Sequence, residues 1–289
     1  MANERAIVIT GASTGIGRAC VERAAKEGAH VFAGVRKQAD ADSLKQEFGD
    51  SVTPLILDVT NDAQIQAAVA QVSAWLNGRT LFGLVNNAGI AVAGPLPLQP
   101  LTDVRKQFET NFFGLHAATQ AFLPLLGADR TRTGAPGRVV MMSSVGGKNG
   151  SPFVGAYAAS KHAVEGYSQS LRRELMLYGI KVVVVAPGAV ATPIWDKADE
   201  DPDLARYRES DYGAATDTVR KYMIGLGRQG LPPSAIGDVV WTGLAHPNPR
   251  QRYTVLRGKF MNYTLPRILP QPMVDNIIAN RLGLRQPRR

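Results

Sequence analysis

A short apolar run leads directly into a glycine-rich turn in Ala6-Ile7-Val8-Ile9-Thr10-Gly11-Ala12-Ser13-Thr14-Gly15-Ile16-Gly17. The apolar run predicts a buried strand, and the helical pattern that follows begins inside the turn. Glycine has no Cβ and lets a phosphate approach the backbone, while a helix N-terminus supplies unpaired N–H groups and a positive dipole end. We therefore favour a phosphate-binding turn over an ordinary turn, with contacts from Gly11, Ser13, Thr14, Gly15, Ile16 and Gly17.

Outward from this turn, short apolar runs alternate with longer helical patterns along the chain. The expected strands are residues 6–10, 30–35, 52–57, 81–86, 138–143, 181–186 and 252–256, and the expected helices are 16–27, 63–77, 102–126, 154–178 and 233–246. Seven strands joined by helical crossovers predict a parallel sheet. Continuously apolar runs such as Val182-Val183-Val184-Val185 are typical of strands covered by helices on both faces, which predicts a doubly wound α/β fold.

The composition fits one large globular domain, because 45% of the 289 residues are hydrophobic and 20% are charged. We expect a single domain over residues 1–257, with a polar, glycine-interrupted substrate lid at about 192–233. A chain without a long apolar run or a signal-peptide pattern, and with Cys20 as its single cysteine, is expected to be cytoplasmic. The four histidines and Cys20 show no metal-ligand spacing, so no metal site is expected.

The net charge of +9 raises the question of which anionic partner the chain binds. Basic residues are scattered and do not alternate with stacking aromatic residues, so nucleic acid is not an expected partner. Residues 258–289 form a C-terminal extension that mixes apolar and basic side chains, and we expect it to pack on the body or on a partner. Membrane-surface binding is the less favoured alternative, because Pro266, Pro270 and Pro272 interrupt any long amphipathic helix.

The end of the second expected strand indicates which dinucleotide is bound. An NAD site needs a carboxylate there for the ribose 2′-hydroxyl, but this chain places Arg36 and Lys37 after Val35. Two cations suit a 2′-phosphate, so NADP(H) is the preferred cofactor and NAD(H) the alternative. A solvated basic turn is also open, because Asp40 and Asp42 lie close enough to fold back. After the third strand, Asp58 with Val59 either contacts the adenine or caps a helix.

Tyr157 and Lys161 stand four residues apart in a run of good helix formers, with Ser144 thirteen residues upstream. Side chains at this spacing are neighbours on a helix surface, so the ammonium can favour the phenolate and lower the tyrosine pKa. The pair suits proton transfer to a carbonyl oxygen. Ser143 competes with Ser144 for the site, because adjacent residues of a strand point to opposite faces, and the spacing to Tyr157 favours Ser144.

These motifs together resemble the short-chain dehydrogenase/reductase family, in its form of about 250 to 300 residues with a Rossmann fold. The resemblance covers residues 5–256 and rests on the glycine turn, Asn86-Asn87-Ala88-Gly89, Asn111, Ser144, Tyr157, Lys161, and Pro187-Gly188 followed by Thr192. The segments Val31-Phe32-Ala33-Gly34 and Ser143-Ser144-Val145-Gly146-Gly147 are similar to the hydroxysteroid and retinol dehydrogenase branch.

The resemblance implies a catalytic tetrad of Asn111, Ser144, Tyr157 and Lys161. Tyr157 would act as general acid and base, Ser144 would hold the substrate oxygen, Lys161 would bind the nicotinamide ribose, and Asn111 would hold a helix kink or a water. Further cofactor contacts are implied for Asn87, Ala88, Gly89, Pro187, Gly188, Val190 and Thr192. Thr192 would bond the nicotinamide amide, with a helix cap as the alternative.

The family pattern also places Val145, Phe153, Val154, Ile194 and Trp195 around the carbonyl. These side chains are apolar, so the expected substrate is a small hydrophobic ketone, aldehyde or alcohol. Pairing into a homodimer or homotetramer through helices 102–126 and 154–178 is implied as well. Two alternatives remain open: a dinucleotide-binding redox sensor without turnover, and a membrane-surface steroid or retinoid dehydrogenase that uses NAD.

Overall fold

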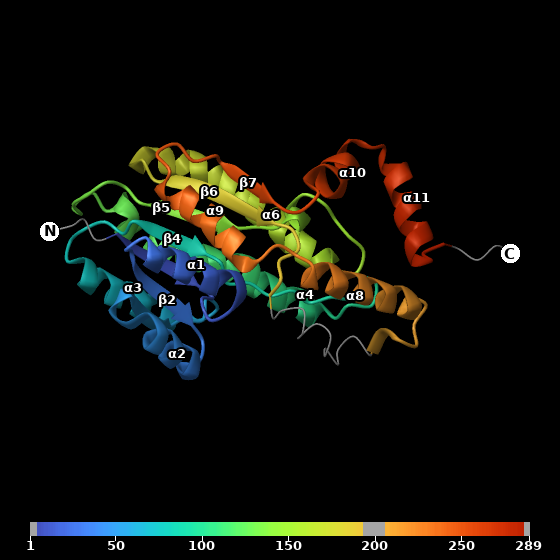
Figure 1. The fold of residues 1–289 in the computed structure, drawn as a ribbon, viewed down its shortest axis with the longest axis horizontal. Helices are drawn as coiled ribbons and strands as arrows, with labels where there is room; N and C mark the ends of the chain where they lie inside the picture. The colour runs from blue at the N-terminus through green and yellow to red at the C-terminus, as the bar shows by residue number, and fades with distance from the viewer. Residues whose placement is uncertain (1–4, 193–205, 286–289) are drawn as a thin grey trace.

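The computed structural model describes residues 5–192 and 206–285, and its centre is a seven-stranded parallel sheet (Figure 1). The strands stand in the order β3-β2-β1-β4-β5-β6-β7. Their bounds are β1 Ala6–Thr10, β2 His30–Val35, β3 Val52–Ile56, β4 Gly83–Asn86, β5 Arg138–Met142, β6 Lys181–Pro187 and β7 Arg252–Val255. All six strand pairings are parallel, so the predicted doubly wound Rossmann fold is confirmed.

Helices cover both faces of the sheet and enclose two hydrophobic clusters. One cluster packs the sheet against α3, α5 and α6 through side chains such as Val72, Phe122 and Val164, and the other packs it against α1, α2 and α9 through Val21, Leu44 and Ile236. The bounds are α1 Gly15–Lys26, α2 Gln38–Phe48, α3 Asp62–Leu76, α4 Leu101–Phe108, α5 Gly114–Phe122, α6 Gly155–Glu174, α8 Gly213–Arg228 and α9 Pro233–Ala245.

The strand order changes direction between β1 and β4. After β1 the chain adds β2 and β3 toward one edge of the sheet, and after β4 it adds β5, β6 and β7 toward the other edge. In open parallel sheets, ligands bind outside the carboxyl ends of the strands at such a switch point. The glycine turn after β1 and the Asn87 segment after β4 both lie there. The topology therefore brings the predicted cofactor and catalytic segments together at the carboxyl ends of the parallel strands.

Part of the expected lid is helical. Helix α8 occupies Gly213–Arg228, whereas residues 193–205, with the predicted substrate contacts Ile194 and Trp195, lie outside the described residues. Tyr207 is buried, and the ring of Tyr212 meets the ring of Phe153 edge-on with centroids 6.2 Å apart. These two lid tyrosines pack the segment against the body.

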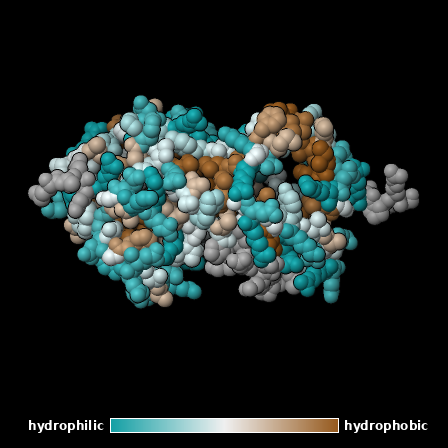
Figure 2. Space-filling view, in the orientation of Figure 1, coloured by the Kyte–Doolittle hydropathy of each residue, from teal (hydrophilic) through white to brown (hydrophobic). Residues whose placement is uncertain are grey.

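The C-terminal extension does not pack broadly on its own body. It forms a π-helical segment Phe260–Thr264, α10 Leu265–Ile268 and α11 Gln271–Leu282, with a proline near the start of each α-helix. Tyr263 is its one buried residue in the described part, and α11 has none. Figure 1 shows α10 and α11 standing away from the sheet, and Figure 2 shows apolar surface gathered over them. In the described chain no helix has the length and apolar character needed to cross a membrane.

Apolar side chains are also exposed on the elements expected to mediate pairing. Leu101 at the start of α4, Phe113 before α5, and Met176 and Leu177 just after α6 are each more than half exposed. Large exposed apolar side chains grouped on neighbouring helices are typical of protein interfaces. Pairing through these helices stays a prediction.

Candidate active site

The glycine turn is fastened to the end of β4 by polar contacts. Asn87 Nδ2 donates to the carbonyl oxygens of Thr10 (3.0 Å) and Gly11 (2.9 Å), and Thr10 Oγ1 accepts from the backbone N–H groups of Asn87 and Ala88, both at 3.0 Å. Buried polar groups paired in this way hold their segments in fixed positions. Thr10 was not singled out in the sequence, because a threonine at a strand end is an ordinary residue there.

Two positions in the turn require glycine. Gly11 has a φ of +65°, and a Cβ there would lie 2.8 Å from Ala88 Cα; a Cβ at Gly17 would lie 2.1 Å from the Gly11 oxygen. The backbone is therefore uncovered at the N-terminus of α1, where N–H groups face outward, and Thr14 at the N-cap makes no side-chain cap. Ser13 and Ile16 are half-buried beside it. This geometry fits a pyrophosphate.

The cations predicted to select the cofactor are accessible. Arg36 and Lys37 follow β2 and are both exposed, and Lys37 is the N-cap residue of α2. Asp42 Oδ1 accepts a hydrogen bond from Gln38 Nε2 at 2.8 Å, and within the described chain neither Asp40 nor Asp42 pairs with these cations. The acidic residues do not fold back, which favours the 2′-phosphate interpretation over the neutralised turn.

Asp58 orders the turn after β3. Its Oδ1 accepts from the backbone N–H of Thr60 at 2.9 Å and from Thr60 Oγ1 at 2.7 Å. The N-cap of α3 is Asn61, whose side chain accepts from Gln64 N, so Asp58 is not the cap itself. Val59 is buried against the start of α5. A contact from Asp58 to the adenine stays a prediction.

Tyr157, Lys161 and Ser144 come together as expected. Tyr157 and Lys161 lie one turn apart on α6, and Ser144 Oγ and the Tyr157 ring are neighbours, since a Cβ at Gly146 would lie 3.4 Å from the first and 3.6 Å from the second. Lys161 Nζ lies 5.9 Å from the centre of the Tyr157 ring and donates to the Met142 oxygen at 2.9 Å. The phenol, the hydroxyl and the amine therefore face one point beside the carboxyl end of β5.

Burial dominates the acid–base properties of this group. Burial raises the pKa of Tyr157 and outweighs the hydrogen bond from Ser144, which acts in the opposite direction. Burial also lowers the pKa of Lys161 to about 8. The expectation of a lowered tyrosine pKa was wrong for this arrangement, because that argument counted the ammonium charge and left out the loss of water around the phenol.

The structure decides between Ser143 and Ser144. The Ser143 hydroxyl is taken up by Glu165, to whose carboxylate it donates at 2.7 Å. Ser144 Oγ accepts from Gly146 N at 3.0 Å and faces Tyr157. Ser144 is therefore the serine that lies beside Tyr157, and its part in the chemistry stays a prediction.

Asn111 lies where the long helix between residues 101 and 122 is interrupted. The π-helical segment Glu109–Phe113 separates α4 from α5 and contains Asn111, which is fully buried. Asn111 Oδ1 accepts from Ile90 N at 2.8 Å, and its Nδ2 donates to Ile90 O (2.9 Å) and Ser160 Oγ (3.0 Å). The expected helix irregularity is confirmed; the water is not tested. Ser160, on α6 beside Lys161, was missed because a small polar helix residue gives no signal.

On the substrate side, Phe153 is buried and Val145 and Val154 are half-buried near Tyr157. Phe153 takes a φ of +66°, an uncommon conformation for a bulky residue that often marks a constrained functional segment. Arg206, a cation of the lid segment, pairs with Asp103 at 2.7 Å. The described lining is apolar.

The segment after β6 returns to the glycine turn. Pro187 ends the strand, Gly188 N donates to Val255 O at 2.9 Å, and Val190 is buried in a parallel bridge with Leu231. A Cβ at Gly15 would lie 3.1 Å from Thr192 Cγ2, so Thr192 faces the turn. This position agrees with the predicted cofactor contact, and the helix-cap alternative concerns residues outside the described chain.

Comparisons with known proteins identify this arrangement. A family described as short chain dehydrogenase matches residues 5–203, more than half of the chain. The chain belongs to the short-chain dehydrogenase/reductase family. It is an oxidoreductase of that type, and the resemblance predicted from its motifs is confirmed.

Individual members of the short-chain dehydrogenase/reductase family match over most of the chain. The chain is 36% identical to an NADPH-dependent 3-dehydrocapnine reductase from Ornithobacterium rhinotracheale, over 94% of this chain and 95% of that protein. It is 29% identical to estradiol 17-beta-dehydrogenase 2 from Rattus norvegicus, over 96% of this chain and 75% of that protein. A short-chain dehydrogenase from Streptomyces avermitilis superimposes with a TM-score of 0.75 at 26% identity, covering 98% of both chains.

The remaining side chains that could carry chemistry are the single cysteine and those that can bind a metal ion. Cys20 is buried in the core, and burial raises the pKa of its thiol to about 12, so it stays protonated and packs as an apolar residue. Among residues 5–192 and 206–285, no three His, Cys, Asp or Glu side chains are grouped to hold a metal ion.

Proposed function

We propose that this chain is an NADP(H)-dependent oxidoreductase that interconverts a hydrophobic ketone or aldehyde and the corresponding alcohol. The observation that carries the proposal is that Tyr157, Ser144 and Lys161 meet beside the carboxyl end of β5, on the side of the sheet where the glycine turn also lies. Carbonyl reduction needs an acid–base group, a hydroxyl that binds the carbonyl oxygen and a dinucleotide site close together, and this arrangement supplies all three.

Tyr157 supplies the proton in the reductive direction. A nicotinamide cofactor, when bound, would supply the hydride to the carbonyl carbon. As negative charge develops on the carbonyl oxygen, Ser144 Oγ donates a hydrogen bond to it and the Tyr157 hydroxyl transfers its proton, which leaves an alcohol and a phenolate. Because burial raises the pKa of Tyr157, the tyrosine is in its acid form at neutral pH, and this favours reduction.

Lys161 and Asn111 support that transfer. A protonated Lys161 beside Tyr157 stabilises the phenolate that remains, since the two groups lie within one helical turn. Asn111 holds the backbone of Ile90 and so fixes the segment that carries Gly89; a Cβ there would lie 3.2 Å from Asn111 Oδ1 and 3.6 Å from Lys161 Nζ. One buried amide thus ties the segment after β4 to α6 beside Lys161.

Arg36 and Lys37 favour NADP(H) over NAD(H). A guanidinium can form paired charge-assisted hydrogen bonds with a phosphate, and no carboxylate of the described chain faces these two cations. The relative from Ornithobacterium rhinotracheale is named as NADPH-dependent, which supports the same choice.

The described lining and the relatives both support an apolar substrate. Phe153, Val145 and Val154 present apolar side chains near Tyr157, and the lid cation Arg206 is held by Asp103. The relatives are named for 3-dehydrocapnine and for estradiol. NADPH consumption with a series of apolar ketones tests this function and separates it from a dinucleotide sensor that binds without turnover.

The C-terminal extension supports a second proposal, association with an anionic membrane surface. Phe260, Met261, Ile268, Met273 and Ile277 are each more than half exposed. The 32 residues 258–289 carry six Lys or Arg and only Asp275 as an acid. A second copy would bring like charges together at this surface, whereas anionic lipid complements the charge and accepts the apolar side chains.

We expect the full chain to float with vesicles that contain anionic lipid, and to float less as salt is raised, because the attraction is electrostatic. Ile277→Glu should weaken flotation clearly. Met176→Glu is the matched control, since Met176 is also more than half exposed but lies outside the extension. Equal flotation of the two variants, or none by the wild type, would contradict this proposal; dimers lost only in Ile277→Glu would point to a second copy instead.

A further inference from the structure

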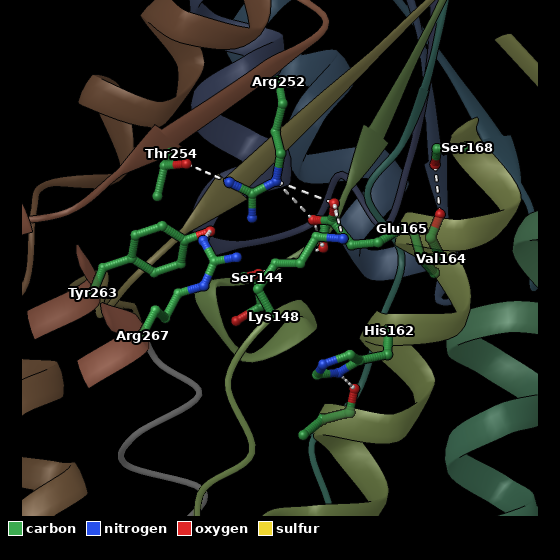
Figure 3. Close-up of polar contacts among 12 residues, drawn as sticks. Ser144, Lys148, His162, Val164, Glu165, Ser168, Arg252, Thr254, Tyr263 and Arg267 are labelled. Atoms are coloured by element: carbon green, nitrogen blue, oxygen red, sulfur yellow. Dashed lines mark hydrogen bonds and ion pairs between the residues drawn. The ribbon is translucent and has the colours of Figure 1, made fainter. Parts of the chain in front are cut away.

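A buried carboxylate lies behind the Ser144 turn. Glu165 stands one helical turn after Lys161 on α6 and is 2% exposed. It accepts from Ser143 Oγ at 2.7 Å and from Arg252 Nε at 3.0 and 3.1 Å, and Lys148 Nζ lies 3.8 Å from it. A charged group is rarely buried so completely unless its partners compensate for lost water, and here three side chains from two other segments do so (Figure 3).

These contacts hold both ends of one short turn. Ser143 stands immediately before Ser144, and Lys148 immediately after the 3-10 turn Val145–Gly147. The turn is also pressed closely on α6, because a Cβ at Gly147 would lie 2.6 Å from Ser143 Oγ and 3.0 Å from Glu165 Cγ. The position of Ser144 relative to Tyr157 is therefore set by what Glu165 binds.

Arg252 connects the carboxylate to the C-terminal extension. Its Nη1 donates to Thr254 Oγ1 on the same strand, and its guanidinium carbon lies 5.6 Å from the centre of the Tyr263 ring. Tyr263 is the buried residue of the extension, and its hydroxyl accepts from Arg267 Nη1 at 3.0 Å. Figure 3 shows Arg252 between Glu165 on one side and Tyr263 with Thr254 on the other.

We infer that Glu165 is a positioning residue for the reaction, and that Arg252 links the Ser144 turn to the extension through it. Neither residue touches the reacting atoms; Glu165 acts by fixing the Ser143 hydroxyl and so the backbone that carries Ser144. Small displacements of catalytic groups lower rates strongly, so loss of this anchor lowers turnover without removing any group of the tetrad. The inference rests on the proposed reductase activity.

The first test compares variants that alter Glu165 or one of its partners. Glu165→Gln keeps the shape and removes the charge, and Ser143→Ala removes only the hydroxyl that reaches Glu165. We expect kcat per cofactor-binding site to fall about tenfold in both, with the cofactor Kd within about twofold of wild type. The kcat of Arg252→Met should fall by a similar factor. The kcat of Arg252→Lys should be higher than that of Arg252→Met, because lysine restores a cation.

Tyr253→Phe is the matched control on β7. Tyr253 neighbours Arg252, but its hydroxyl accepts from Arg250 N and its side chain packs in the cluster on the other face of the sheet. Its kcat should stay at the wild-type value. Because kcat is counted per cofactor-binding site, a variant that merely loses folded protein shows no fall; unchanged kcat in Ser143→Ala and Glu165→Gln would overturn the inference.

A second measurement does not need turnover. Hydrogen–deuterium exchange over residues 143–149 should become faster in Glu165→Gln and Ser143→Ala, whereas exchange in β1 and α1 stays at the wild-type rate. Unchanged exchange at 143–149 would overturn the inference even if the wild type reduced none of the ketones tried. If the wild type reduces none of the ketones but exchange is faster in the two variants, the proposed function is contradicted. The contact of Glu165 with the Ser144 turn would still be supported.

Discussion

Replacing Tyr157 with phenylalanine is expected to lower kcat for ketone reduction by about 10³-fold, within the range for a lost general acid. The change removes one oxygen and keeps the ring that Lys161 faces at 5.9 Å, so the fold and the dinucleotide cradle stay intact. We therefore expect the NADPH Kd to stay within a few-fold of wild type. Stopped-flow or steady-state NADPH consumption, with Kd from cofactor fluorescence, measures both quantities.

The pH dependence of reduction by the wild type tests the same role of Tyr157. Tyr157 has a raised pKa and stays protonated, whereas the pKa of Lys161 is lowered to about 8. Reduction should be level below about pH 8 and decline above it, as Lys161 loses the charge that stabilises the phenolate. Retained turnover in Tyr157→Phe, or a reduction rate that rises above that pH, would remove Tyr157 from the acid–base role.

Changing Arg36 to aspartate is expected to reverse the choice of cofactor. Charge-assisted hydrogen bonds contribute roughly 1.5 to 3 kcal/mol, so their loss, with a new carboxylate for the 2′-hydroxyl, should lower the NADPH to NADH ratio of kcat/KM by about 100-fold. Arg36 is exposed and forms no hydrogen bond or ion pair with other described side chains, so the substitution should leave stability nearly unchanged.

Arg105→Asp is the matched control for charge, because Arg105 is exposed on α4 and the substitution alters net charge by the same amount. It should leave the cofactor ratio unchanged. An NADPH preference that survives Arg36→Asp would place the 2′-phosphate on other residues.

Much of the architecture could be predicted because strands at the centre of a doubly wound sheet are apolar on both faces. Six of the seven strands begin where the apolar runs predicted, and β4 begins two residues later, at Gly83. Helix α2 was missed because only Ala41 and Leu44 of its residues are buried, which leaves too narrow an apolar stripe. Helix α8 was missed because Gly225 and Gly227 interrupt its pattern within the expected lid.

The catalytic side chains were more predictable than their surroundings. Tyr157 and Lys161 share a helix, so their spacing alone fixes their contact. Glu165 and Arg252 are 87 residues apart and meet only because β6 and β7 lie beside β5 in the sheet. Burial of the Tyr157 phenol depends on that same tertiary packing, which is why the sequence indicated the wrong direction for its pKa.

Turnover of apolar ketones is the most direct test of the central claim. Purified protein is mixed with NADPH or NADH and with steroid ketones, retinal and small aryl ketones, and consumption of the reduced cofactor is followed by its absorbance. The account predicts turnover of bulky apolar carbonyls with NADPH, and much slower turnover with NADH. Tight NADPH binding without turnover of any of these carbonyls would contradict it and favour a dinucleotide sensor.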